Sequence, residues 1–102
     1  MKKKSDLIVF ASARAKPGKE KDLERALRNV AGPTRSQPGS VAFSLYRSQE
    51  NPAMILALER WGSKTEHERH LQGTHVQKLM SAMADILAEP PQISSFDILD
   101  EE

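Results

Sequence analysis

Apolar and polar residues along the first third of the chain predict a strand followed by a helix. The stretch from Asp6 to Lys16 is rich in β-branched and apolar residues and runs into the turn pair Pro17-Gly18. From Glu20 onward, apolar residues recur with helical spacing. These residues are Leu23, Ala26, Leu27, Val30 and Ala31. The sequence therefore predicts a helix with one buried stripe that frays or ends at Gly32-Pro33.

The middle of the chain predicts a hairpin of two strands. Pro38-Gly39 forms a turn, residues 40–48 alternate between apolar and polar, and a second turn at Asn51-Pro52 leads into a third strand over 53–61. Along this third strand both faces are substantially apolar, so both need to be covered.

The last third of the chain predicts two helical segments and a final strand. Ser63-Lys64-Thr65-Glu66 is a capping-box pattern, which predicts a short helix over about 63–71. Thr74 repeats this signature before a longer apolar stripe. The stripe consists of Val76, Leu79, Met80, Met83, Ile86 and Leu87. Pro90-Pro91 is expected to stop this second helix, and residues 92–99 alternate as a strand.

The resulting order, β-α-β-β-α-β, predicts an α+β fold of the ferredoxin-like type. Short connections and right-handed crossovers place both helical regions on one face of a four-stranded antiparallel sheet. A second copy of the same sheet would cover the bare face, so we expect a homodimer with a dimeric α+β barrel. We expect one domain over 1–102, with an ordered core over about 7–99.

Composition excludes several classes of function. The 102 residues include 15 basic and 14 acidic side chains, and a net charge of +1 gives no field that would attract nucleic acid. The basic start, residues 1–4, is short and is interpreted as solvated. No cysteine is present, which excludes disulfides, thiolate nucleophiles and cysteine-ligated zinc. The longest apolar run, Leu7 to Ala11, is too short for a membrane span or a signal peptide, so we expect a cytoplasmic protein without membrane contact.

Candidate chemistry is concentrated between Leu58 and His75. Glu59 lies in an apolar strand beside Trp61, so it is exposed at the end of the strand, paired with Arg60 or a histidine, or desolvated with a raised pKa and available as a base. His70 precedes an apolar residue of the short helix and is either packed or part of a pocket. His75 stands at a helix start, where the helix dipole favours a neutral ring, although a capping role is equally consistent.

The sequence favours neither a site role for the remaining histidine nor a metal site. His67 is flanked by Glu66, Glu68 and Arg69, which favours a surface position. The three histidines with Glu59 offer nitrogen and oxygen ligands, but their spacing matches no standard zinc arrangement. We therefore predict no metal.

Several residues, taken in order, resemble the antibiotic biosynthesis monooxygenase family. They are Pro17-Gly18, Pro38-Gly39, the stretch ALERW with Glu59 and Trp61, His70-Leu71, Thr74-His75, and Pro91. This resemblance covers about Leu7 to Leu99 and implies a dimeric α+β barrel with a small-molecule pocket in each subunit. Members of the family include cofactor-independent monooxygenases of phenols, haem-degrading enzymes and an isomerase of a phosphorylated sugar derivative.

The chain departs from the family at positions that shape the pocket. Phe43 stands where many members have tyrosine, and Leu58 stands where an aromatic residue is frequent. A more aliphatic pocket with fewer hydroxyl donors argues against a polycyclic substrate and against haem degradation. With Trp61, these two residues are the predicted substrate contacts.

The leading hypothesis is a cofactor-free monooxygenase of a small phenol or quinol that uses molecular oxygen. The resemblance implies Glu59, His70 and His75 as its catalytic residues, with His70 or His75 as base and Glu59 orienting it. Two alternatives remain: a dimer that binds small molecules without catalysis, and an isomerase of a small hydroxycarbonyl compound. A phosphorylated substrate of the isomerase would need anion contacts, for which Arg14, Arg35 and Arg47 are the candidates.

Overall fold

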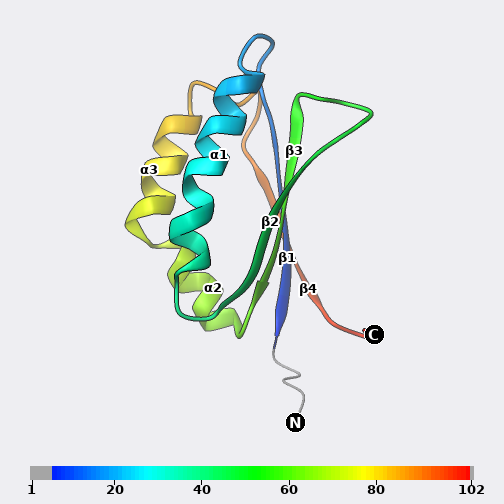
Figure 1. The fold of residues 1–102 in the computed structure, drawn as a ribbon, viewed down its shortest axis with the longest axis vertical. Helices are drawn as coiled ribbons and strands as arrows, with labels where there is room; N and C mark the ends of the chain where they lie inside the picture. Colours follow the sequence, from blue (N-terminus) through cyan, green and yellow to red (C-terminus); the bar gives the residue numbers. More distant parts are fainter. Residues whose placement is uncertain (1–5, 102) are drawn as a thin grey trace.

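The computed structural model describes residues 6–101. Over these residues the chain forms one four-stranded antiparallel sheet and three helices, all of which lie on the same side of the sheet (Figure 1). The elements are β1 (Leu7–Arg14), α1 (Glu20–Arg35), β2 (Ser40–Arg47), β3 (Met54–Trp61), α2 (Lys64–Leu71), α3 (Thr74–Met83) and β4 (Gln92–Asp97). The basic start, residues 1–4, lies outside the described residues.

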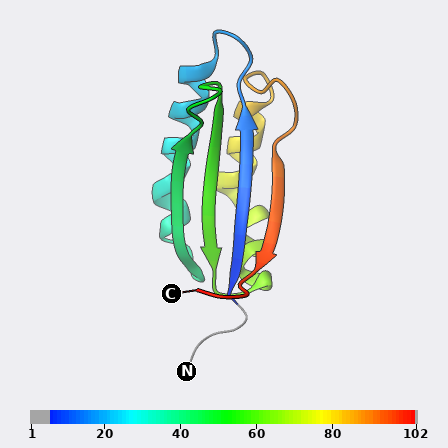
Figure 2. The same ribbon diagram turned by 90° about the vertical axis from the view of Figure 1, so that its right-hand side faces the viewer.

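The strands lie side by side in the order β2-β3-β1-β4, which Figure 2 shows from the side that no helix covers. The two central strands, β1 and β3, are antiparallel with Val9 opposite Glu59 and Ala11 opposite Ala57. This topology confirms the predicted ferredoxin-like arrangement, in which two β-α-β halves place their helices on one face.

Helix α1 continues past the predicted stop at Gly32-Pro33 and ends at Arg35. Pro33 lies in the last turn of α1, where the missing N–H costs a single backbone hydrogen bond and few residues follow it. The chain closes there as Ser36 N–H donates to Gly32 O over 3.2 Å. The helix thereby gains one further buried residue, Thr34, on the stripe that faces the sheet.

The short helix α2 begins as predicted, whereas α3 does not. The Ser63 hydroxyl accepts a hydrogen bond from Glu66 N–H over 3.2 Å, as expected of a capping box. The residue that precedes α3 is Gly73, without a side-chain cap, so the predicted capping role of Thr74 is wrong. Pro38-Gly39 forms the predicted turn, with Gly39 at φ 88° and its Cα packed under the Glu66 side chain.

Helix α3 ends at Met83, earlier than its apolar stripe predicted. The following backbone bonds to the end of β1 instead of continuing the helix. Ala88 N–H donates to Arg14 O, and Lys16 N–H donates to Ile86 O, both over 2.8 Å. Leu87 nevertheless stays buried, because this irregular segment returns its side chain to the core.

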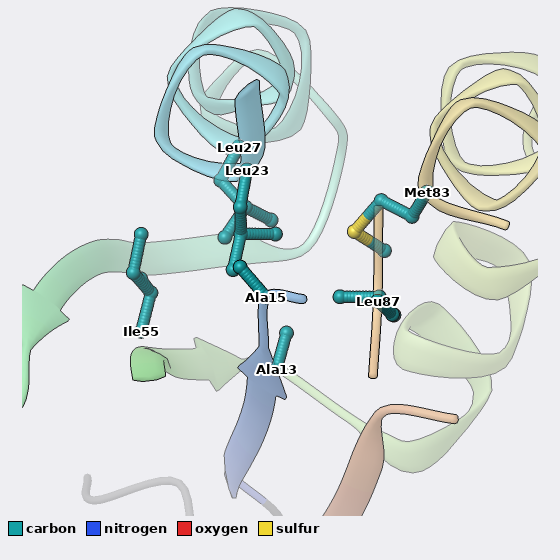
Figure 3. Close-up of a cluster of buried hydrophobic side chains, with 7 residues drawn as sticks. All are labelled: Ala13, Ala15, Leu23, Leu27, Ile55, Met83 and Leu87. Atoms are coloured by element: carbon teal, nitrogen blue, oxygen red, sulfur yellow. The ribbon is translucent and has the colours of Figure 1, made fainter. Parts of the chain in front are cut away.

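The main core fills the end of the molecule where β1 leads into α1. It comprises seven side chains from both central strands, α1 and the segment around α3 (Figure 3). They are Ala13, Ala15, Leu23, Leu27, Ile55, Met83 and Leu87. A second cluster of Val30, Ala31, Phe43 and Ala57 lies between α1 and the sheet. A cavity lies beside these two clusters.

Candidate functional site

A cavity of about 280 Å³ lies between the helices and the covered face of the sheet. This volume is near the lower end of the roughly 300–1,000 Å³ usual for small-molecule sites. Its walls are mostly aliphatic, with a few polar side chains. The polar lining residues are Ser12, Thr34, Glu59, His70 and Gln77, and the larger apolar ones are Leu27, Val30, Phe43, Leu71, Val76, Leu79, Met80, Met83 and Ile93.

Glu59 reaches the cavity from the central strand β3. Its side chain points to the helix-covered face because strand residues alternate, and the residue is 5% exposed. Trp61, two residues later on the same face, donates its indole N–H to Glu59 Oε1 over 2.8 Å. Burial raises the pKa of the Glu59 carboxyl, and the hydrogen bond from Trp61 partly opposes this rise.

Trp61 affects the cavity indirectly, through its contacts with Glu59 and His70. It is fully buried and is not one of the residues that line the cavity. Its ring packs on that of His70, with centroids 4.7 Å apart. The indole thus fixes both titratable side chains of the site.

His70 lines the cavity from α2 and is held by a residue far away in the sequence. Its Nδ1 lies 2.6 Å from Oε1 of Gln37, in the connection between α1 and β2. An amide oxygen only accepts hydrogen bonds, so this contact places the ring proton on Nδ1 and leaves a lone pair on Nε2. Burial first, and then the neighbouring His75 and His67, lower the pKa of His70 to about 4. The ring is consequently neutral near pH 7.

The other two histidines do not line the cavity. The prediction that His67 lies on the surface is wrong: it is 6% exposed and its ring centroid lies 5.9 Å from that of Trp61. Its neighbours Glu68 and Arg69 are exposed, whereas α2 turns His67 and His70 together onto Trp61 at the end of β3. His75 lies next to His70, with ring centroids 5.5 Å apart, and its buried Nε2 makes no hydrogen bond to any residue between 6 and 101.

The predicted substrate contacts separate onto the two faces of the sheet. Phe43 pairs with Glu59 across β2 and β3, shares its face and lines the cavity. Leu58 pairs with Phe10 and Ser44 on the face opposite the three helices (Figure 2). It therefore does not reach the cavity of its own chain.

The arginines proposed as anion contacts also lie away from the cavity. Arg14 is paired with Glu89 and Arg47 with Glu24. Arg35 donates to the Phe43 carbonyl from Nε and Nη2, over 3.1 and 3.0 Å. Since none of them lines the cavity, it offers no guanidinium to a phosphate.

The described part of the chain contains neither a cluster of metal ligands nor a helix suited to crossing a membrane. Between residues 6 and 101, no three His, Asp or Glu side chains are grouped so that they could hold a metal ion. No helix in that range has the length and apolar character needed to cross a membrane.

Sequence reasoning missed two residues of this region, Thr34 and Gln37. Thr34 follows Leu27 and Val30 at helical spacing, so extending the stripe of α1 past Pro33 would have found it. Gln37 carries no local signal, because its partner His70 is 33 positions away.

Comparison with known proteins gives one family and a set of similar folds. The model of the family described as antibiotic biosynthesis monooxygenase matches residues 6–82. The uncharacterized protein sll1783 of Synechocystis is 24% identical over 92 residues, which make up 90% of this chain and 63% of that protein. The chain thus spans less than two thirds of the length of this curated relative.

Two solved structures are closely similar in fold. The protein PA3566 from Pseudomonas aeruginosa has a TM-score of 0.89 at 23% identity, with 98% of this chain and 100% of that one covered. Rv0793 from Mycobacterium tuberculosis also has a TM-score of 0.89, at 24% identity, with 95% and 98% covered. At these identities the likeness establishes the fold.

Proposed function

Because the chain belongs to the antibiotic biosynthesis monooxygenase family, we propose that it is a homodimeric, cofactor-independent oxygenase of a small phenolic or quinol substrate. The observation that carries this proposal is the presence of both Glu59 and a neutral His70 on the wall of one mostly aliphatic cavity. Such a site can take a proton from a bound phenol and keep the resulting anion away from bulk water.

Glu59 is the stronger base of the two side chains. Burial raises the pKa of Glu59 and lowers the pKa of His70 to about 4. A general base works best when its pKa lies near the working pH, so Glu59 is assigned the proton transfer. His70, with its lone pair on Nε2, accepts a hydrogen bond from the substrate and orients it. His75 lies behind His70 and supports its position.

The electrons for oxygen chemistry come from the substrate. A deprotonated quinol is electron-rich and reduces molecular oxygen directly: one oxygen atom enters the ring, the other leaves as water, and the substrate is oxidised to a hydroxyquinone. The protein contributes deprotonation, orientation and exclusion of water. Leu27, Val30 and Phe43 supply the apolar wall that this requires.

The homodimer is supported by the uncovered face of the sheet. Phe10 and Phe96 lie there 38% and 47% exposed, with ring centroids 5.1 Å apart, and Tyr46 is 52% exposed. Leu56 and Leu58 share this face. Large exposed apolar patches mark interaction surfaces, and a second copy of the same sheet matches this one in shape. Sedimentation that shows only monomer at micromolar concentration would exclude the dimer.

Oxygen uptake tests the reaction. Uptake above the spontaneous rate is expected with members of a panel of hydroquinones and dihydroxynaphthalenes, and Glu59→Gln should reduce kcat by about 100-fold or more, as expected for loss of a general base. Activity should rise with pH through the raised pKa of Glu59, because the base must be ionised. Glu24→Gln is the matched control, since Glu24 pairs with Arg28 and Arg47 away from the cavity. No uptake above the spontaneous rate would exclude the oxygenase.

A further inference from the structure

Thr34 combines complete burial with an unpaired hydroxyl. It lies in the last turn of α1 and is 0% exposed. Its Oγ1 makes no hydrogen bond to any residue that the structure describes. Buried polar groups in proteins nearly always have a partner, so an unpaired one requires an explanation.

A hydrogen-bond acceptor for the Thr34 hydroxyl is available within α1, but the hydroxyl does not bond to it. A threonine inside a helix commonly donates its hydroxyl to the carbonyl four residues earlier, which here belongs to Val30. That bond is not formed. The unpaired state of the hydroxyl is therefore not explained by the backbone of α1.

Thr34 lines the same cavity as Glu59 and His70. It continues the row of Leu27 and Val30 on the face of α1 that forms the cavity wall. Thr34 is the polar end of this otherwise aliphatic row. Along α1 the cavity wall is therefore aliphatic except at Thr34, the one residue of this row that carries a hydroxyl.

We propose that Thr34 is a specificity-determining residue whose hydroxyl forms a hydrogen bond with an oxygen atom of the bound ligand. A hydroxyl both donates and accepts, so it pairs equally with a phenol, a phenolate or a carbonyl oxygen. A hydrocarbon of the same shape leaves the hydroxyl unpaired, and such a site discriminates against it. The inference rests on the proposed small-molecule function of the cavity but does not depend on its oxygen chemistry.

Phe43 lines the same cavity from β2. It stands on the facing wall and lacks the hydroxyl of a tyrosine, so β2 supplies no side-chain donor at that position. Thr34 supplies one from the helix side instead. The ligand class is therefore a small, largely apolar compound that carries at least one hydroxyl or carbonyl oxygen.

The test uses Thr34→Val, which keeps the side-chain shape and removes the hydroxyl, and Thr34→Ser, which retains the hydroxyl. Binding is measured by calorimetry under nitrogen, so that no turnover occurs. The probes are 1-naphthol, the dihydroxynaphthalenes, and 1-methylnaphthalene as the counterpart without oxygen. Thr65→Val, at an exposed threonine of α2, is the control variant.

Thr34→Val should weaken binding of at least one oxygen-bearing probe by about five- to tenfold, the loss expected for one neutral hydrogen bond. Binding of 1-methylnaphthalene should stay within about twofold, and Thr34→Ser should retain the affinity of the unaltered protein for the oxygen-bearing probes. Thr34→Val should leave the urea midpoint unchanged or higher, because it removes an unpaired buried hydroxyl.

Three results would overturn the inference. These are equal losses for the hydroxylated and methylated probes, no loss for any probe, and no binding of any probe to the unaltered protein. Binding with the expected pattern but without oxygen uptake would exclude the oxygenase and leave the role of Thr34 standing. The two proposals can therefore fail separately.

Discussion

Replacing Trp61 with phenylalanine tests how Glu59 is held. The change removes the indole N–H that donates to Glu59 Oε1 over 2.8 Å. A hydrogen bond to a charged group contributes about 1.5–3 kcal/mol. The smaller ring also leaves a void of about 40 Å³, which costs about 1 kcal/mol. The free energy of unfolding should fall by about 2.5–4 kcal/mol at pH 7.

The loss should depend on pH, and its sign follows from Glu59. The pKa of Glu59 is raised by burial, so the folded state holds the proton more tightly than the unfolded state. Ionisation of Glu59 therefore reduces stability as the pH rises through the folded pKa. Trp61 opposes that reduction, so Trp61→Phe should raise the pKa of Glu59 further. Its stability deficit should be smaller at pH 4, where the carboxyl is protonated, than at pH 7.

The assay is urea unfolding followed by circular dichroism, because Trp61 is the sole tryptophan and its fluorescence is lost in the variant. The effect of Trp61→Phe on the free energy of unfolding is measured in the otherwise unaltered protein and in the Glu59→Gln variant, which completes a double-mutant cycle. The cost should be smaller in the Glu59→Gln background, where the bond is neutral. Equal costs in both backgrounds and at both pH values would refute the reasoning and leave Trp61 as a packing residue only.

Three further predictions concern His70 and the local supports of the fold. The pKa of His70 is lowered to about 4, so the folded state should lose stability as the pH falls from about 6.5 to 4 and the unfolded chain takes up the proton. His70→Asn should remove about 2 kcal/mol of this loss, measured by urea unfolding at several pH values. Parallel curves of stability against pH for the variant and the unaltered protein would contradict this prediction. Gly39→Ala should lower the melting temperature more than Gly18→Ala. Both glycines have positive φ, but of the two only Gly39 is placed so that an added Cβ meets a side chain. Equal shifts in melting temperature would be inconsistent with the packing around Gly39. Ser63→Ala should lower the free energy of unfolding by about 1 kcal/mol because it removes a helix cap, whereas Thr74→Ala, at a position without a cap bond, should change it little. Similar losses of stability in the two variants would argue against this difference.

Regular spacing in the sequence predicted most of the architecture. The period of two along β3 placed Glu59 and Trp61 on one face, and the structure shows them hydrogen-bonded there. The same alternation places Leu58 on the other face, so its predicted role beside Glu59 conflicted with a pattern already present in the sequence. The predicted dimer and the catalytic roles of Glu59, His70 and His75 stay predictions.

Proline was a less reliable predictor of where a helix ends. Gly32-Pro33 predicted the end of α1, but a proline in the last turn removes only one hydrogen bond. Packing of the helix against the sheet outweighs that loss, and the turn that carries Thr34 remains helical. A cavity residue was missed because the strength of a local stop signal depends on its tertiary surroundings.

The sequence by itself determined the order of the elements, the buried stripe of α1 and the face of β3 that carries Glu59, because these follow from backbone repeats that neighbouring residues encode. Only the tertiary structure decided the state of the histidines. His67 looks exposed among charged neighbours, but α2 packs it against Trp61. His70 receives its proton position from Gln37, 33 residues away, and its low pKa from burial. The burial, tautomer and pKa of these histidines depend on contacts between segments that are distant in the sequence. No local sequence pattern predicts those contacts.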